Sequence, residues 1–418
     1  MQQTEGQKPT QMPQRPDRMF SDHARAVVRS VRGAFSELLT SVGADPQAPQ
    51  EFGRQFKLNK NLAWKISKLV QTDDPSVALA QMPGTGGINI FLRSIETAGA
   101  SPALLQTARQ AIKEYDDLIR THSGDRATLE IMASELSPVS RRQRDEHHRK
   151  LLFQGASYVW GAHARVSLKV GLVGPSRKTD RLDFASVSAL IDFRRFRSDV
   201  TWVMASRRSR NDDGSRMDTP SMEPIDRRFG QADAAPLMED FCSKPLPELR
   251  KVDTPTGMNF ELVEGPVGNA GARTCVFGVI QRNIPYCRSP ENEWGEHSAV
   301  SDTPAEWLIV DLFIHERFTF AIPPEAALYS ELGASGAPYP ARGREKHRLP
   351  LSEPLQDLAT GPLLVATPEV SNYRHMVQTV FDRMGWDPQY FHGFRMKMAF
   401  PPIPAAFVLR YRLPDAPV

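Results

Sequence analysis

Apolar residues recur at helical spacing along the first third of the chain. Between Asp22 and Val42 they fall at every third or fourth position, as expected for one buried face of a helix. No Asn-Gly turn and no alternating run interrupts this region, so we predict an all-helical domain over residues 21–136. The preceding residues, 1–20, are rich in Gln, Pro and Thr and are predicted to form a disordered tail. Within the domain, helices are predicted over 22–42, 50–56, 61–70, 87–98, 102–121 and 126–136.

The pattern changes after Gly161, where polar and apolar residues begin to alternate. The run ARVSLKVGLV at 164–173 is the clearest case, and short β-branched and aromatic runs follow it towards the C-terminus. One later helix is predicted at 371–384, ending before Gly385. We therefore predict a β-rich α+β domain over residues 161–418, and the α+β class for the whole chain.

Three polar segments separate or interrupt these elements. The charged stretch SPVSRRQRDEHHRK predicts a basic connecting helix over residues 137–160, either a solvated connector or a face that touches a phosphate backbone. Residues 206–231 and 331–354 lack apolar periodicity and are predicted to be long loops. The run at 193–202 interleaves arginines with aromatic residues, which fits an outward strand face or stacking on single-stranded bases.

Composition narrows the class of protein without naming a function. A chain of 418 residues, 40% hydrophobic and 24% charged, is large enough for two or three globular domains. The net charge of +3 is too small to indicate whether the protein binds nucleic acid, so that prediction depends on local basic patches. Cys242, Cys275 and Cys287 form no CxxC pair, which argues against a disulfide framework or a cysteine zinc site. No apolar run could serve as a signal peptide or a membrane span, so a cytoplasmic protein is expected.

The segment QEFGRQFKLNKNLAWKISKL, residues 50–69, carries the most specific pattern in the chain. A helix-turn-helix needs a small residue where its helices cross, an apolar residue in the turn and apolar residues on the inner faces. Gly53 fits the crossing and Leu58 fits the turn. The inner-face positions are Phe52, Phe56, Leu62, Ala63, Ile66 and Leu69.

The second helix of this segment would turn a polar and basic surface outward. Lysine side chains contact phosphates, asparagine can hydrogen-bond a base edge, and the N–H groups at a helix start favour phosphate. We therefore predict binding to double-stranded DNA, with no cofactor and no metal. A plain two-helix corner with solvated lysines, or a helical module that docks another protein, would show the same pattern. The predicted DNA contacts are Asn59, Lys60, Asn61, Trp64, Lys65 and Lys68.

This second half, LNKNLAWKISKL, resembles the recognition-helix segment of IclR-type bacterial transcription regulators. The resemblance covers about 20 residues and implies a DNA-reading helix. Two positions differ from that family: Lys57 stands where it prefers glycine, and Ala63 where it prefers a β-branched residue. Residues 72–87 continue into helix instead of a wing hairpin, so a wingless module is predicted. The matching positions are Leu58, Asn59, Lys60, Asn61, Trp64, Lys65 and Ile66.

No sequence motif of an enzyme stands out. The chain contains no HExxH, GxGxxG, GxxxxGK[ST] or GxSxG pattern. PGTGG at 83–87 follows no predicted strand, and we interpret it as a break between helices. His315, in LFIHERF on or just past a predicted strand, could act as a base or a metal ligand, and His297, near Glu293 and Glu296, is another candidate. An ordinary solvated or hydrogen-bonded strand histidine fits His315 as well.

Three hypotheses of function follow from these patterns. The first is a DNA-binding transcriptional regulator whose C-terminal domain senses an unidentified effector or assembles the protein into a homo-oligomer. The second is an interaction or structural assembly protein that binds no nucleic acid. The third is an enzyme of an unrecognised family with its site near His315.

Overall fold

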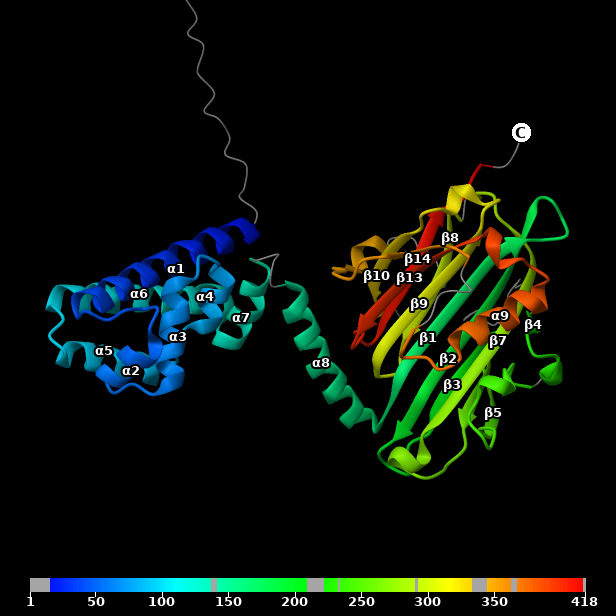
Figure 1. The fold of residues 1–418 in the computed structure, drawn as a ribbon, viewed down its shortest axis with the longest axis horizontal. Coiled ribbons are helices and arrows are strands. Elements are labelled where there is room, and N and C mark those ends of the chain that lie inside the picture. The colour runs from blue at the N-terminus through cyan, green and yellow to red at the C-terminus, as the bar shows by residue number, and fades with distance from the viewer. Residues whose placement is uncertain are drawn as a thin grey trace, which may run out of the picture. The chain divides into compact units, whose positions relative to one another are not determined.

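The chain forms two compact units, residues 1–144 and residues 145–418. Helices make up the first unit and strands dominate the second, so the α+β class predicted from the sequence is confirmed (Figure 1). The computed structural model describes residues 16–136, 141–208, 222–231, 234–289, 292–332, 344–361 and 367–415.

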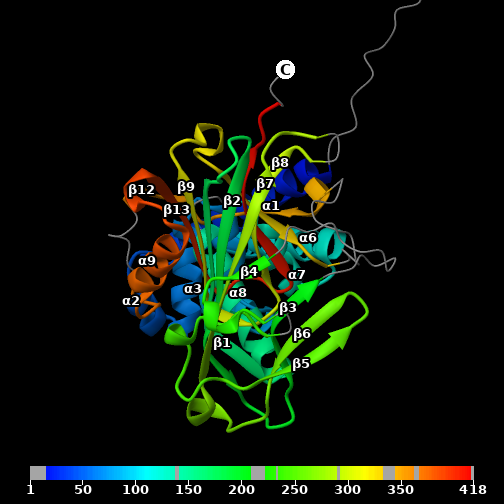
Figure 2. The same ribbon diagram turned by 90° about the vertical axis from the view of Figure 1, so that its right-hand side faces the viewer.

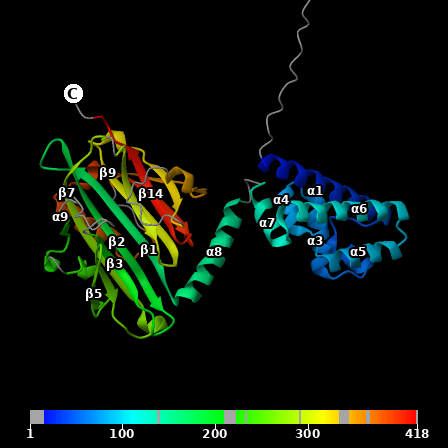
Figure 3. The same cartoon turned by 180° about the vertical axis from the view of Figure 1, so that it is seen from behind.

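In the described part of the first unit, seven α-helices surround one apolar core. They are α1 (Pro16–Ser41), α2 (Pro49–Gln55), α3 (Lys60–Gln71), α4 (Pro75–Gln81), α5 (Thr85–Thr97), α6 (Pro102–Leu118) and α7 (Arg126–Ser134). The two longest, α1 and α6, lie side by side (Figure 3). The rings of Phe35 of α1 and Phe91 of α5 pack in the core at a tilt of 44°, with centroids 5.0 Å apart. The apolar stripes of the sequence therefore face one another, as an all-helical unit requires.

Several helix boundaries in this unit differ from the predictions, most of all the start of α1. α1 begins at Pro16 instead of Asp22, because Phe20 is buried in the core and extends the helix. Residues 16–20 of the predicted tail are thus helical, while residues 1–15 lie outside the described part of the chain. The PGTGG segment separates two helices only through its first residues, since α5 already begins at Thr85.

The second unit is a sandwich of β-sheets with one covering helix. Its helices are α8 (Arg141–Trp160) and α9 (Tyr373–Met384). Its strands are β1 (Ala162–Pro175), β2 (Arg181–Arg195), β3 (Trp202–Arg208), β4 (Met222–Pro224), β5 (Leu249–Thr254), β6 (Gly257–Leu262), β7 (Arg273–Pro285), β8 (Trp294–Ser301), β9 (Ala305–His315), β10 (Glu325–Ser330), β11 (Arg348–Leu349), β12 (Gln356–Thr360), β13 (Phe391–Ala399) and β14 (Ala405–Arg412).

The largest sheet has the strand order β12-β13-β9-β1-β2-β7-β4. Its strands pair antiparallel except for β1 and β9, which run parallel although more than a hundred residues separate them in sequence. One face packs on α9, where Val170 and Phe381 share a core (Figure 2). The other face packs on the sheet β11-β10-β14-β8, where Leu312 and Phe407 share a second core. A third sheet, β3-β6-β5, lies beside them (Figure 2).

The predicted connecting helix over 137–160 corresponds to α8, which begins at Arg141, and residues 137–140 lie outside the described part of the chain. The second half of α8 packs within the second unit. Arg149 forms an ion pair of 2.5 Å with Glu353, and Phe153 stacks on His163. This part of α8 is therefore a component of the second unit.

The two long loops predicted over residues 206–231 and 331–354 contain strand residues near their ends. Strand β3 continues to Arg208, β4 pairs with β7, and β11 pairs with β10, while residues 209–221 and 333–343 lie outside the description. The arginine-rich run at 193–202 is also not one outward face, because Phe193 and Arg195 are buried. The Arg195 guanidinium donates to the carbonyl oxygen of Val263 at 3.1 Å, so this arginine anchors the end of β6.

Candidate functional site

Helices α2 and α3 meet in a tight corner formed by residues 56–59. A Cβ atom added to Gly53 would lie only 3.1 Å from the Cβ of Ala63, so the helices cross where a small residue is required. Within the corner the Leu58 N–H donates to the carbonyl oxygen of Gly53 at 2.8 Å, which places the Leu58 side chain in the core. Lys57 has a φ of +54°, the left-handed conformation that glycine adopts most easily.

Asn59 ends the corner and begins α3. Its Oδ1 atom accepts a hydrogen bond of 2.8 Å from the Leu62 N–H, which makes Asn59 the N-cap. The side chain of Asn59 thus has a structural role, while its amide NH₂ group and the second lone pair of Oδ1 remain available to a ligand. Its contact with DNA stays a prediction.

The two sides of α3 are cleanly separated. Lys60, Asn61, Trp64, Lys65 and Lys68 are all exposed. At about 100° per residue these five positions fall within an arc of about 140°. The buried positions occupy the opposite arc, and they are Leu62, Ala63, Ile66, Ser67 and Leu69.

The exposed side of α3 is positively charged and carries no acid. Residues 52–72 contain five basic residues and no Asp or Glu. Within the described part of the chain, Lys60, Lys65 and Lys68 form no hydrogen bond or ion pair that would neutralise them. Trp64 lies among them with 41% of its surface exposed. The five basic residues are Arg54, Lys57, Lys60, Lys65 and Lys68.

Polar bonds and close packing hold the other side of α3 in place. The Ser67 hydroxyl donates to the carbonyl oxygen of Pro46 at 2.7 Å, and the Gln71 amide donates to the same oxygen at 2.6 Å. A Cβ added to Gly87 of α5 would lie 3.2 Å from the Leu62 side chain. These contacts fix α3 on the unit with its basic side outward.

Of the two histidines considered for an enzyme, His315 makes contacts within the protein and His297 is buried. The Nδ1 atom of His315, at the end of β9, accepts from the Arg317 N–H at 3.1 Å, and its ring packs edge-on against Phe391. His297 on β8 is buried. Burial, and secondarily the charge of Lys169, lowers the pKa of His297 to about 3. Neither histidine shows a hydrogen-bonded acid partner of the kind that orients a catalytic base.

Within the described residues, no helix combines the length and apolarity needed to cross a bilayer. Comparison with known protein families, curated proteins and solved structures finds nothing that matches this chain.

Proposed function

We propose that residues 50–71 form a helix-turn-helix that binds double-stranded DNA, and that the protein is a transcriptional regulator. The observation that carries this proposal is the exposed side of α3, which presents basic residues and no acid opposite a fully buried side. The second unit would sense an effector or assemble the protein into a homo-oligomer. The resemblance to the recognition helix of IclR-type regulators points the same way.

In this proposal each exposed side chain has a separate task. Lys60, Lys65 and Lys68 contact phosphates, and Asn61 hydrogen-bonds a base edge in the major groove. The N–H groups of Lys60 and Asn61, in the first turn of α3, are available to a phosphate. The Leu62 N–H is not available, because Asn59 caps it.

Trp64 favours a second candidate function, the docking of another protein. A large aromatic side chain that is 41% exposed amid charged residues is typical of the centre of a protein interface. In that case the lysines form the rim of the contact and the protein is an assembly component without nucleic acid. Binding to duplex DNA separates the two candidates.

The test is fluorescence anisotropy of the full chain with a labelled random-sequence duplex at several salt concentrations. We expect binding that weakens steeply with salt, since each phosphate contact adds about one unit to the log–log slope. Lys65→Ala should weaken binding to all sequences and reduce that slope by about one. Asn61→Ala should instead relax preference at one base position, at a cost of about 1–3 kcal/mol.

The matched control is Lys113→Ala, which removes one exposed lysine from α6 of the same unit. Its salt slope should equal that of the wild type. Equal losses in Lys65→Ala and Lys113→Ala would mean that charge alone binds DNA and that α3 is not the interface. If the wild type does not bind duplex even at low salt, the regulator proposal is wrong and the docking function of Trp64 takes its place.

A further inference from the structure

A cavity of about 520 Å³ opens in the second unit over the inner face of the largest sheet. It is large enough for a small organic ligand. The register of the strands builds its floor, because Lys169 of β1 is paired with Ser188 of β2, which in turn is paired with Phe277 of β7. Ser186 lies two residues further along β2 and on the same side of the sheet.

The walls of the cavity are mainly apolar and come from other elements. Phe260 of β6 contributes one wall and Phe229 another. Polar side chains line the floor, where Lys169 is paired in register with Ser188 and Ser186 lies on the same side of β2. An apolar chamber with a few convergent donors is the usual form of a small-molecule site.

Two cations, Lys169 and Arg207, are among the residues that line the cavity, and none of the described lining residues is Asp or Glu. Within the described part of the chain, the Lys169 ammonium makes no ion pair or hydrogen bond, and neither do the hydroxyls of Ser186 and Ser188. An ammonium withdrawn from water without a counter-ion is costly, so an anion that enters the cavity gains a strong partner.

The imidazole of His297 lies near Lys169 and does not neutralise it. The ring of His297 covers Gly171, where an added Cβ would lie 2.8 Å from the ring, and Gly171 is two residues from Lys169 on the same face of β1. Burial keeps this imidazole neutral at physiological pH, as its pKa of about 3 shows. Burial also lowers the pKa of the Lys169 ammonium.

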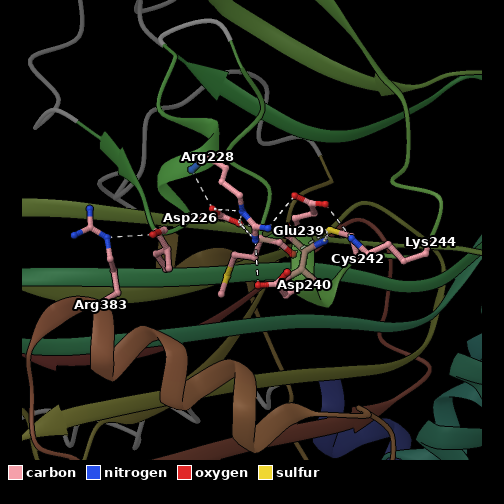
Figure 4. A network of polar contacts seen from close by, with 10 residues as sticks. Asp226, Arg228, Glu239, Asp240, Cys242, Lys244 and Arg383 are labelled. Carbon is pink, nitrogen blue, oxygen red and sulfur yellow. Dashed lines mark hydrogen bonds and ion pairs between the residues drawn. The ribbon is translucent and has the colours of Figure 1, made fainter.

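A network of ion pairs fixes the wall that contains Phe229 (Figure 4). Arg228 is bound to Asp226 at 2.6 Å, to Glu239 at 3.0 Å and to Asp240 at 3.1 Å. The Asp226 carboxylate also accepts from the Arg228 N–H at the start of the short helical turn that leads into Phe229. Asp226, Glu239 and Asp240 are thus all paired with Arg228, and this network holds the segment that contains Phe229 in place.

From these observations we infer that the cavity binds a small organic anion, a carboxylate with an apolar body of one or two rings. The carboxylate pairs with the Lys169 ammonium and accepts hydrogen bonds from Ser186 and Ser188. The ring packs between Phe229, Phe260 and Phe277. This site depends only on contacts within the second unit, so its test is independent of whether α3 binds DNA.

The experiment is a ligand-observed NMR titration of the full chain, which detects binding into the millimolar range. The probes are 4-phenylbutyrate and indole-3-acetate, each compared with its uncharged primary amide. We expect each acid to bind about tenfold more tightly than its amide, because the charge-assisted contact is lost in the amide. Lys169→Met should remove this preference while affinity for the amides stays within about twofold.

The control is Lys178→Met, which removes an exposed lysine from the turn between β1 and β2 and should leave every affinity unchanged. If Lys169→Met does not fold, as judged by circular dichroism, Ser188→Ala serves instead and should weaken the acids about threefold or more. The inference is overturned if neither acid binds, if acids and amides bind equally, or if the preference for acids survives in the folded variant.

Discussion

The two units differ in what they bury. In the described part of the first unit, the buried polar side chains are two serines, Ser67 and Ser76, and no charged residue is buried. In its described part, the second unit buries seven acidic, histidine or arginine side chains, Asp183, Arg195, His297, Asp311, Glu353, Arg395 and Arg410. The first unit therefore keeps its charges on its surface, where they can meet a partner. The second uses charges internally, as structural pairs and as the lining of a cavity.

The largest effect expected from this difference is at Arg395. Its guanidinium donates to Asp311 from Nε at 2.8 Å and from Nη2 at 2.6 Å, and the Tyr373 hydroxyl donates to the same carboxylate. Arg395→Ala leaves the Asp311 carboxylate buried without its cation and should lower the free energy of unfolding of the second unit by about 3–5 kcal/mol. Urea unfolding followed by circular dichroism measures this change.

The control for Arg395 is Arg250→Ala, which removes an exposed ion pair of 2.8 Å with Glu261. It should cost no more than about 1 kcal/mol. Equal costs for the two variants would show that the buried pairs do not stabilise this unit more than surface pairs do.

In the first unit the largest effect should come from an apolar residue. Ile66 of α3 is fully buried. Ile66→Ala removes apolar contacts and leaves a cavity, which should cost about 2–5 kcal/mol of stability. Its neighbour Lys65 is exposed, and Lys65→Ala should change stability by less than about 0.5 kcal/mol. Thermal unfolding of both variants checks the pair, and similar melting temperatures would mean that α3 faces the other way.

Acid should also affect the second unit more than the first. Burial lowers the pKa of His163 to about 4 and that of His297 to about 3, below their ordinary value of 6.5. The unfolded chain therefore binds protons that the folded unit excludes. Stability is complete above pH 6.5 and is lost as the pH falls towards 4, by at most about 1.4 kcal/mol per pH unit for each histidine. Hydrogen exchange at pH 7 and pH 4.5, resolved by mass spectrometry, compares the two units, and an equal loss of protection in both would contradict this expectation.

The smallest expected effect is the difference in stability between two variants of α3, Asn59→Ala and Asn61→Ala. Asn59 caps α3 through its side chain, so Asn59→Ala should lower stability by about 1 kcal/mol. Asn61 is exposed with no such bond, and Asn61→Ala should alter DNA preference without altering stability by more than about 0.5 kcal/mol. Denaturant midpoints of the two variants measure the difference. If Asn59→Ala is as stable as the wild type, its cap contributes nothing and the residue is available to a ligand.

The first unit could be predicted well because burial there follows apolarity. The spacing of Leu62, Ile66 and Leu69 predicts the buried side of α3, and the structure buries all three. The role of Asn59 was missed, although an asparagine directly before a helical stripe is a known signal for an N-cap. The start of α1 was missed because a single apolar residue, Phe20, gives no periodic pattern by itself.

The second unit could be predicted only at the level of its strands. The alternation in ARVSLKVGLV predicts β1, but it does not reveal what covers the polar side of the strand. That depends on the parallel pairing of β1 with β9 and on the position of β8, both of which are remote in sequence. Lys169 therefore could not be recognised as part of a cavity, and buried Asp311 and Arg395 could not be recognised as partners until β9 and β13 were paired.

In the turn between α2 and α3, Lys57 has opposite effects on folding stability and on the binding of an anionic partner. Lys57 holds a left-handed backbone conformation that costs a residue with a side chain about 1–2 kcal/mol and costs glycine almost nothing. A glycine at this position would make the corner firmer, but it would also remove a positive charge beside α3. If this surface binds a polyanion, Lys57→Gly raises the free energy of unfolding but lowers the affinity for that polyanion. Lysine at position 57 would then trade some folding stability for affinity, and selection for stability alone would favour glycine there.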